Sequence, residues 1–594
     1  MATGRAALEL TRAAGERCAN HRARGDFDAR GATGFTVRAL SRCLLAILVL
    51  LACSRPEDGL AARNALLITL DTTRADALGA YGRNPSVTPV LDELASESVR
   101  FAEAQSVAPL TLPAHASMLT GLEPPRHTLR DNGLWPLPDE ARSLAELASD
   151  RGLATAAFVS SSVLDRSFGL AAGFATYDQP ARAARTTTSY FGEHSASETA
   201  RSASKWLRQL PSEQRFFAWV HFFDPHVPYA PPEAFLQAAG GDAYLGEVAF
   251  VDNGVGELLA TLRARGLLDD TLVIVTADHG EALGEHGEPT HGVFCYQSTL
   301  HVPLFVRYPD GFGAGSSVRE PVSLVDLAPT IAEALDLPLG GEADGRSLFR
   351  VDAPAARGVY FECYAGFLDY GWSPLAGWRD TLGKYIASPT PEWFDLDADP
   401  RELRNLLPAR EGQRVHFERA LGELATRPAL QRAAPLALDA ELAAELAALG
   451  YASSGVPVDD LPSPLARVEL PSPAERTAEL HAFLQATAYL DQRAYRDAVP
   501  LLEAITSENP RNAAALDRLG FALMQLERFD EARQVLERRL GMPQRRSETH
   551  YNLAACFEHL GSIEAALTHL RAALALDPNS LAAREALARL KPRQ

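Results

Sequence analysis

Apolar residues in the first two thirds of the chain form short continuous runs rather than an alternating pattern. Three of these runs read ALLITLD at 65–71, FFAWVHFFDPH at 216–226 and TLVIVTADHG at 271–280. Runs of this length, separated by segments with helical periodicity, are typical of strands buried in a parallel sheet. The pattern therefore predicts an α/β domain with a doubly wound, mostly parallel sheet over residues 64–340.

All three predicted strands end in polar residues. Asp71 ends the first, Asp224 and His226 lie at the end of the second, and Asp278 and His279 at the end of the third. In open α/β sheets, ligands bind outside the carboxyl ends of the strands. We therefore expect a functional site at this edge, although Asp71 taken alone is also suited to cap a helix after its strand.

The pattern changes after residue 340, where the apolar runs become shorter. Runs at 358–364 and 384–400 predict strands of a small α+β subdomain over 341–430, closing against the first domain. Residues 431–473 are rich in Ala, Leu and Pro, which predicts a short helix followed by an extended linker.

Residues 474–591 repeat with a period of about 34 residues, which predicts three units. Three sets of apolar positions share this step, and a set of prolines closes the units: Ala498, Ala532 and Ala566; Tyr495, Phe529 and Ile563; Leu502, Leu536 and Leu570; Pro510, Pro543 and Pro578. Such a period, with small residues where two helices cross, resembles the tetratricopeptide repeat, an all-α stack that binds peptides or partner proteins. An unrelated helical bundle is the alternative.

The N-terminus carries the pattern of an export segment over residues 1–53. Residues 43–52 form an apolar run that follows two arginines and is too short to span a bilayer. The run ends in LLAC, which resembles the bacterial lipoprotein box with Cys53 as the lipidated residue. We expect an exported protein on the periplasmic or cell-envelope face, held to the membrane only by that lipid, with a plain secretory signal or a short anchor as the alternative. A translation start near Val37 would explain the Arg-rich residues 1–36.

The net charge of the chain excludes some classes of binding partner, and its cysteine spacing excludes some kinds of structural site. The chain holds 57 Lys and Arg against 76 Asp and Glu, a net charge of −19, which argues against nucleic acid or an anionic membrane surface as a partner. An anionic small substrate stays open, because a metal ion can reverse the local field. The six cysteines show neither a disulfide framework nor zinc-finger spacing.

The segment TLPAHASMLTG at 111–121 begins like a helix, with Thr111 in a position to cap it and a proline in the first turn. His115 follows in the same turn, where the helix dipole disfavours a cation and favours an anion. A hydroxyl and an imidazole there could face a bound oxyanion. The capping interpretation and this one stay open for the segment alone.

Asp71, Asp278 and His279 supply hard oxygen and borderline nitrogen ligands, which suit Zn, Mn, Mg or Ca. A neutral imidazole favours a transition ion. The Thr111 hydroxyl is the candidate fourth ligand, because metal coordination lowers a hydroxyl pKa and creates a nucleophile.

Four ordered blocks resemble the sulfatase family within the alkaline phosphatase superfamily over residues 64–430. They read LLITLDTTRADALGAYG at 66–82, TLPAHASMLTG at 111–121, TADHGEALGEHG at 276–287 and YGWSPLAGWRDTLGKYIASP at 370–389. The resemblance implies a metal-dependent hydrolase of sulfate or phosphate esters that works through a covalent enzyme intermediate.

Two departures from the family pattern matter. Sulfatases place Cys or Ser, then x-Pro-x-Arg, where this chain has Thr111 and His115, so the formylglycine of sulfatases cannot form. A threonine ester must be cleaved by water at phosphorus or sulfur, which favours phosphate mono- or diesters and leaves sulfate esters open. Thr72 replaces the second acidic ligand after Asp71, as in phosphonate-ester-hydrolysing relatives, which indicates one metal and makes calcium a poorer fit.

The same resemblance names three further site residues. Asn132 matches an Asn-Gly turn of the family, His226 matches a His-x-Pro segment that contacts ester oxygens, and His291 replaces a lysine and could protonate the leaving alkoxide. A structural role for each histidine stays open. A two-metal version also stays open, with Asp224, His226 and His291 as ligands of a second ion. Second-layer or structural residues are expected at Arg74, Asp76 and His286.

The sequence thus predicts an exported hydrolase acting on an anionic ester, with a repeat domain for protein interaction. Two other functions remain open. One is an envelope transferase that passes the phospho group to an alcohol instead of water, and the other is an inactive sulfatase fold that serves as a binding platform.

Overall fold

The computed structural model describes residues 61–590 apart from residues 134, 182–192, 342, 351–356, 435, 437–441, 443, 444, 447–460, 464, 467, 468, 543–546 and 579. The predicted export segment with Cys53, and much of the predicted linker, lie outside the described residues. Within the described part, no helix is long and apolar enough to cross a membrane.

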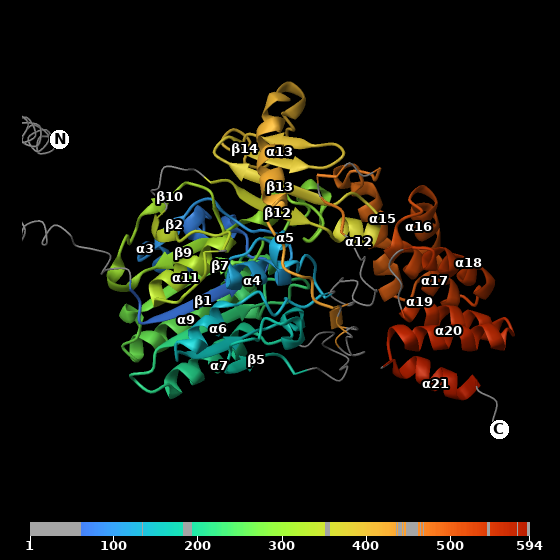
Figure 1. The fold of residues 1–594 in the computed structure, drawn as a ribbon, viewed down its shortest axis with the longest axis horizontal. Coiled ribbons are helices and arrows are strands. Elements are labelled where there is room, and N and C mark those ends of the chain that lie inside the picture. The colour runs from blue at the N-terminus through green and yellow to red at the C-terminus, as the bar shows by residue number, and fades with distance from the viewer. Residues whose placement is uncertain are drawn as a thin grey trace, which may run out of the picture. The chain divides into compact units, whose positions relative to one another are not determined.

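An eight-stranded sheet forms the centre of the first domain (Figure 1). Its strands, in spatial order, are β10 (Ser317–Val318), β2 (Val99–Phe101), β9 (Leu304–Arg307), β7 (Thr271–Ala277), β1 (Asn64–Leu70), β6 (Phe216–Phe222), β4 (Ala154–Phe158) and β5 (Thr176–Asp178). The pairs β7–β1, β1–β6, β6–β4, β4–β5 and β10–β2 are parallel, and β9 runs antiparallel to both of its neighbours. The predicted mostly parallel α/β sheet is confirmed.

Helices cover both faces of this sheet, because consecutive side chains of a strand point to opposite faces. Ala65 and Leu67 of β1 belong to the core that packs under α4 (Thr111–Thr120), α6 (Leu144–Asp150) and α11 (Leu327–Leu335). Leu66, Ile68 and Leu70 belong to the opposite core, under α3 (Pro89–Ser96), α7 (Ala196–Gln209) and α9 (Ala243–Ala264). Burial on both faces explains why these strands read as continuous apolar runs.

Two smaller sheets follow. A three-stranded sheet has the order β11 (Val322–Ser323), β3 (Ala104–Gln105) and β8 (His301–Val302). The predicted α+β subdomain contains an antiparallel sheet of β12 (Val359–Cys363), β13 (Leu375–Asp380), β14 (Gly383–Ala387) and β15 (Glu392–Phe394), with α12 (Ala365–Tyr370) and α13 (Gly412–Ala425). Phe417 and Leu421 of α13 pack into the core of this sheet.

The C-terminal part is a stack of helices. Its members are α15 (Thr477–Asp491), α16 (Tyr495–Glu508), α17 (Ala513–Gln525), α18 (Phe529–Leu540), α19 (Ser547–His559), α20 (Ile563–Leu576) and α21 (Leu581–Leu590). The repeated alanines at 498, 532 and 566 are fully buried at the helix crossings. A Cβ atom on Gly520 would lie 2.5 Å from Leu536 Cδ2, which explains the small residue at that crossing.

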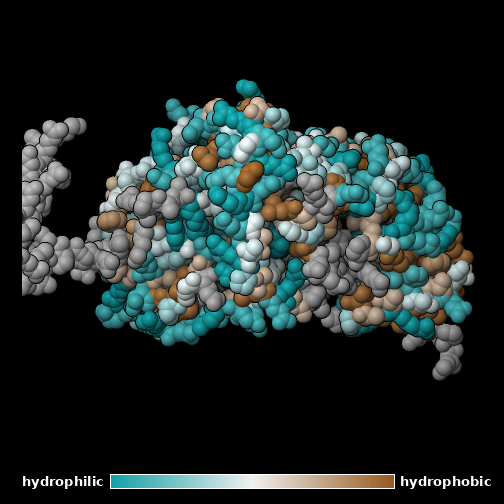
Figure 2. Space-filling view, turned by 45° about the horizontal axis from the view of Figure 1, so that its top comes forward, coloured by the Kyte–Doolittle hydropathy of each residue, from teal (hydrophilic) through white to brown (hydrophobic). Residues whose placement is uncertain are grey.

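On the face of the molecule shown in Figure 2, hydrophilic side chains predominate and apolar ones lie in small separate groups.

Candidate active site

The carboxyl ends of β1 and β7 place two carboxylates side by side. Leu70 of β1 pairs in parallel register with Ala277 of β7, so that Asp71 and Asp278 leave the sheet at the same level. His279 follows directly, and all three side chains are fully buried. One potential ligand atom of each lies within 4.8 Å of the other two, the spacing of a metal site.

Thr111 completes this group from the start of α4. Its Oγ1 lies 3.5 Å from Asp71 Oδ2 and 3.4 Å from His279 Nε2. Leu110 is the N-cap residue of α4, and its apolar side chain makes no capping hydrogen bond. Thr111 is therefore the first helical residue, and its hydroxyl faces the acidic group instead of capping the helix. The four predicted residues at 71, 111, 278 and 279 come together.

The hydrogen bonds of this group fit a divalent cation. Asp71 Oδ1 and Asp278 Oδ2 are buried and have no hydrogen-bond partner among the described residues, which is costly for carboxylates without a cation. His279 donates its Nδ1–H to the Gly280 carbonyl at 3.0 Å, so that the lone pair of Nε2 faces the group. A backbone carbonyl fixes the tautomer of metal-binding histidines in the same way. The residues present fit a metal ion held by two carboxylates, an imidazole and a hydroxyl.

The two carboxylates differ in their pKa values. Burial, together with the charge of Asp278, raises the pKa of Asp71 well above its ordinary value. Burial would also raise the pKa of Asp278, but the adjacent His279, which donates its backbone N–H to Asp278 Oδ1 at 2.8 Å, holds that pKa below its ordinary value. Two carboxylates this close repel each other, and a cation between them would remove the repulsion.

His221, which sequence reasoning missed, holds Asp71 in place. Its Nε2–H donates to Asp71 Oδ2 at 3.1 Å, and its Nδ1 accepts the backbone N–H of Ser160 at 3.4 Å. Burial lowers the pKa of His221 to about 4, which keeps the ring neutral. The available signal was a polar residue inside the apolar run at 216–226, where β6 pairs with β1.

Both ring nitrogens of His115 have protein partners, so its predicted contact with an oxyanion stays a prediction. Its Nδ1–H donates to the Thr111 carbonyl at 2.8 Å, and its Nε2 accepts the Thr69 hydroxyl at 3.0 Å. Trp219 Nε1–H donates in turn to Thr69 Oγ1 at 3.0 Å. Burial lowers the pKa of His115 to about 3, so the ring is a neutral link between α4 and the sheet.

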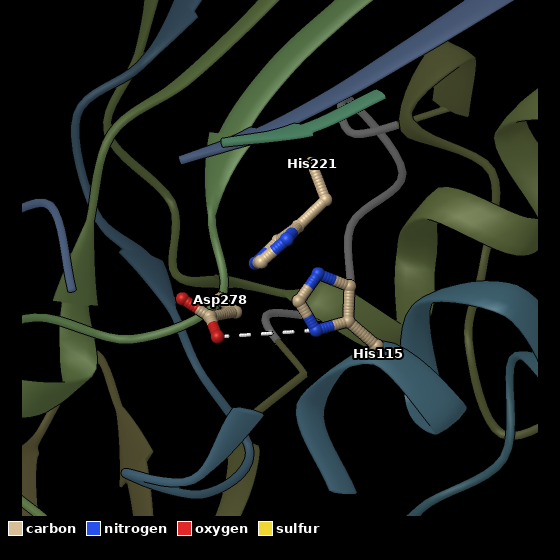
Figure 3. Close-up of side chains that lie close together, drawn as sticks. All are labelled: His115, His221 and Asp278. Carbon is tan, nitrogen blue, oxygen red and sulfur yellow. Dashed lines mark ion pairs between the residues drawn. The ribbon is translucent and has the colours of Figure 1, made fainter. Parts of the chain in front are cut away.

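Figure 3 shows His115, His221 and Asp278, with His115 Nδ1 directed at Asp278 Oδ2 across 3.8 Å. Ligand atoms of these three residues also lie within 4.8 Å of one another. A metal there is disfavoured, because the proton that His115 Nδ1 donates to a carbonyl removes the lone pair that a metal needs. We interpret this group as support for the metal site beside it.

Thr72 adopts a left-handed conformation, with φ of 49°. This conformation is uncommon for a threonine, and it brings the Thr72 N–H to 3.3 Å from Asp278 Oδ1. The Thr72 hydroxyl donates to the Pro225 carbonyl at 2.7 Å. The side chain that replaces the family's second acid thus ties the end of β1 to the loop after β6.

Asn132 contacts the start of α4. Its Oδ1 accepts the backbone N–H of Leu112 at 2.9 Å, and its Nδ2 is buried without a hydrogen-bond partner among the described residues. Asn132 therefore satisfies a free N–H of the first turn and leaves one buried amide donor beside Thr111.

His291 and His226 lie next to the metal group. The rings of His291 and His279 are 4.5 Å apart, and those of His226 and His291 are 5.0 Å apart. His291 Nδ1–H donates to Glu281 Oε1 at 3.2 Å, and Tyr229 donates its hydroxyl to Glu281 Oε2 at 2.9 Å. Burial lowers the pKa of His291 to about 4 and raises the pKa of Glu281 to about 7.

Glu281 and Tyr229 are further residues that the sequence did not assign. Glu281 stands two positions after His279 in the block TADHGEALGEHG, and its partners are His291 in the loop that follows it and Tyr229 in the loop after β6. His226 donates its Nδ1–H to the Val227 carbonyl at 2.7 Å, which leaves the Nε2 lone pair available. Burial lowers the pKa of His226 to about 3.

The structure does not bring Asp224 together with His226 and His291. Asp224 Oδ1 accepts the backbone N–H of Ala196 at 2.9 Å, at the start of α7. Within the described residues, the groups with metal-ligand spacing are the two given above, and neither contains Asp224. Burial raises the pKa of Asp224 to about 6. This arrangement favours the one-metal version.

The three residues predicted to support the site, Arg74, Asp76 and His286, form ion pairs or stack on a ring. Arg74 forms ion pairs with Asp76 at 2.7 Å and Glu285 at 2.8 Å, and it donates to the Glu281 carbonyl at 2.9 Å. His286 stacks on Tyr296 with ring centroids 3.7 Å apart.

Family models match two parts of the chain. A model described as sulfatase matches residues 63–337. Residues 63–337 form a sulfatase domain. Two tetratricopeptide-repeat models match residues 489–555 and 547–590, which identifies the C-terminal helical stack. The sulfatase family is metal-dependent, in agreement with the donor set around Asp71.

Curated relatives are sulfatases. The chain is 27% identical over 411 residues to the ulvan-active sulfatase of Formosa agariphila, and the match covers 60% of this chain and 79% of that protein. It is 35% identical over 174 residues to the choline-sulfatase of Rhizobium meliloti, which covers 28% of this chain and 32% of that protein. The sulfatase domain is therefore that of an ester-hydrolysing enzyme.

A solved structure shares the fold of the sulfatase domain. The phosphonate monoester hydrolase of Agrobacterium radiobacter matches with a TM-score of 0.52 at 23% identity, covering 61% of this chain and 95% of that chain. At 23% identity, this similarity shows a shared fold.

Proposed function

We propose that the chain hydrolyses sulfate or phosphate esters with Thr111 as the nucleophile and one divalent ion held by Asp71, Thr111, Asp278 and His279. The observation that carries this proposal is the position of the Thr111 hydroxyl, 3.4 Å from His279 Nε2 and 3.5 Å from Asp71 Oδ2. A hydroxyl at a helix start, next to two carboxylates and an imidazole, has the surroundings of a metal-activated nucleophile.

A bound Zn or Mn ion would lower the pKa of the hydroxyl and act as a Lewis acid toward the ester. The chain itself orients the nucleophile, since Thr111 is the first residue of α4 and its carbonyl accepts from His115. Asn132 Nδ2, a buried donor without a partner among the described residues, is placed to donate to an ester oxygen. The free N–H groups of a helix start favour the same negative charge.

The first step forms a bond from Thr111 Oγ to phosphorus or sulfur and breaks the bond to the alkoxide. His291 takes up the hydroxyl proton of Thr111 and passes it to the departing alkoxide, so that an alcohol leaves and the ring is neutral again at the end of the step. His226, beside His291, is the candidate contact for the ester oxygens. Water then attacks the threonine ester, which releases phosphate or sulfate and restores the hydroxyl.

Phosphate mono- or diesters, or phosphonate esters, are the favoured substrates. A formylglycine hydrate can expel sulfate by collapsing to an aldehyde, whereas a threonine ester must be opened by water. The fold likeness to a phosphonate monoester hydrolase is in accord with this preference, and the curated sulfatase relatives keep sulfate esters as the second candidate.

We also propose export to the cell envelope with lipid attachment at Cys53, and a protein or peptide partner for the repeats. The LLAC segment supports the first proposal, and the tetratricopeptide-repeat matches support the second.

The test compares rates on aryl phosphate, aryl phosphodiester, phosphonate ester and aryl sulfate, with Zn or Mn added. Thr111→Ala should lower turnover by about 1,000-fold or more, because it removes the nucleophile. Thr120→Ala is the matched control, since this buried threonine of α4 donates only to the Ala116 carbonyl. An unchanged rate in Thr111→Ala, or no turnover of any ester by the metal-loaded protein, would overturn the proposal.

A further inference from the structure

His291 lies in a closed loop over residues 282–294, which we name the histidine loop. The Ala282 N–H donates to the Thr290 carbonyl at 2.7 Å, and the Gly284 N–H donates to the Glu288 carbonyl at 2.8 Å. Glu288 Oε1 accepts the backbone N–H groups of Val293 at 2.7 Å and Phe294 at 3.3 Å. These bonds join both ends of the loop, so a displacement of one part is transmitted to His291.

Helix α15 of the repeat stack contacts this loop. His481 donates its Nε2–H to the Gly287 carbonyl at 2.7 Å. Gly287 has a φ of +79°, and a Cβ atom built on it would lie 3.2 Å from the methyl group of Thr477. The backbone of the loop is thus held at close range by the first turns of α15.

Leu480 adds an apolar contact. Its side chain is 2% exposed and belongs to one core cluster with Val293 and Phe294 of the histidine loop and with the adjacent Tyr296. Phe361 and Trp372 of the small subdomain belong to the same cluster. A residue of the repeat stack therefore closes the core on which the loop rests.

Helix α15 is itself fixed from a second side. Phe483 packs edge to face against Tyr370, with ring centroids 5.3 Å apart. Asn509 Nδ2 donates to the Tyr370 carbonyl at 2.8 Å and to Glu479 Oε1 at 2.6 Å. Contacts to both α12 and the histidine loop give α15 a defined position against the catalytic domain.

We propose that α15 positions His291, with Leu480 and His481 as positioning residues that act through the histidine loop. The proposal rests on the proposed function, in which His291 protonates the leaving group. The repeat domain then has a second task besides binding a partner, because its first helix keeps a catalytic side chain at the correct distance from the substrate.

A displacement of the histidine loop would lower the rate of proton transfer for a geometric reason. Proton transfer needs the donor within hydrogen-bond reach of the leaving oxygen, and a misplacement of 1 Å can cost about 100-fold in rate. Removing the Leu480 side chain leaves a cavity in the core cluster that contains Val293 and Phe294, into which the loop can relax. A relaxed loop moves His291 and leaves the carboxylates at 71 and 278, which β1 and β7 hold, in place.

The experiment uses the full-length chain and two aryl esters with the same sulfuryl or phosphoryl group. One releases 4-nitrophenolate, which departs without protonation, and the other releases phenol, which needs a proton donor. Leu480→Ala and His481→Ala should each lower kcat on the phenyl ester by about tenfold, and on the 4-nitrophenyl ester by less than about twofold. Leu490→Ala is the matched control, because this leucine of α15 packs into the core of the stack, away from the loop.

A general loss of folded structure would lower both rates equally, and such an equal loss overturns the proposal. His481→Ala keeps the test valid if Leu480→Ala does not fold, because His481 is exposed and, within the described part of the chain, its one hydrogen bond is to the Gly287 carbonyl. His291→Ala separates the two proposals. If His291→Ala selectively slows the phenyl ester and neither α15 variant does, positioning by α15 is wrong. If His291→Ala shows no selectivity, the leaving-group role fails and the positioning role fails with it.

Discussion

His221 donates its Nε2–H to Asp71 Oδ2 at 3.1 Å, from a strand that pairs with the strand preceding Asp71. The second ring nitrogen accepts the Ser160 N–H, which fixes the tautomer that donates. This bond directs one lone pair of the carboxylate away from the metal position and leaves Oδ1 for the ion. His221 thus sets the orientation of a candidate ligand without being a ligand itself.

Replacing His221 tests this role. His221→Gln can still donate an amide N–H to Asp71, whereas His221→Leu cannot. We expect His221→Leu to lower metal affinity and turnover by about 10- to 100-fold, with His221→Gln closer to the unmodified protein. Metal titration followed by kinetics at saturating metal measures both effects. Equal losses in the two variants would show that packing, and not the hydrogen bond, is what matters at this position.

Removing a ligand should have a larger effect. Asp71→Asn removes the charge that balances a divalent ion, and we expect loss of bound metal with a fall in turnover of about 100-fold or more. Elemental analysis after dialysis, with and without a chelator, measures the metal content. Asp76→Asn is the control, because this nearby carboxylate is two-thirds exposed and pairs with Arg74. Full metal binding by Asp71→Asn would contradict the assignment.

Glu281 should matter through His291. The Glu281 carboxyl group accepts from His291 Nδ1 and from the Tyr229 hydroxyl, so it holds the ring that faces the metal group. Glu281→Gln keeps an oxygen for His291, and we expect turnover within about threefold, whereas Glu281→Leu should lose about tenfold or more. Steady-state kinetics on one ester measures this difference. If Glu281→Leu is as active as Glu281→Gln, the hydrogen bond to His291 has no role.

The fold and the centre of the site were accessible from the sequence for a physical reason. Strands buried on both faces read as unbroken apolar runs, and parallel strands deliver their last residues to one edge, so Asp71 and Asp278 could be brought together before any coordinates. The helix start at Thr111 left two interpretations open, a capping hydroxyl and one that faces a bound group. These features depend on local pattern and topology.

The other site residues could not be assigned from the sequence, because their roles depend on contacts with side chains from other parts of the fold. His115 stands one turn after Thr111 and was expected to share its environment, but its ring points under α4 to Thr69. His221 showed only as a polar position inside an apolar run, and its partner lies 150 residues away at Asp71. Glu281 was not assigned because its contact with His291, across a loop, follows no helical or strand period. The contact between α15 and the histidine loop joins segments about 200 residues apart, a distance that no periodicity spans.

His127 makes the stability of the catalytic domain depend on pH. The ring is fully buried, its Nδ1 accepts the Leu129 N–H at 3.1 Å, and its Nε2 lies 3.0 Å from Ser117 Oγ. Burial, aided by the charge of Arg130, lowers the pKa of His127 from 6.5 to about 3. A proton on Nδ1 would face the Leu129 N–H, so the folded state excludes it.

The unfolded chain takes up this proton below pH 6.5, whereas the folded chain does so only near pH 3. The contribution of the neutral His127 ring to the free energy of unfolding is therefore complete above pH 6.5 and is lost as the pH falls toward 3. At pH 5 the loss amounts to about 2 kcal/mol of unfolding free energy. His127→Gln has no such proton, so its unfolding free energy should fall about 2 kcal/mol less between pH 7 and pH 5 than that of the unmodified protein. Denaturant unfolding at the two pH values measures this difference, and an identical fall in both proteins would show that His127 is protonated in the folded state as readily as in the unfolded chain.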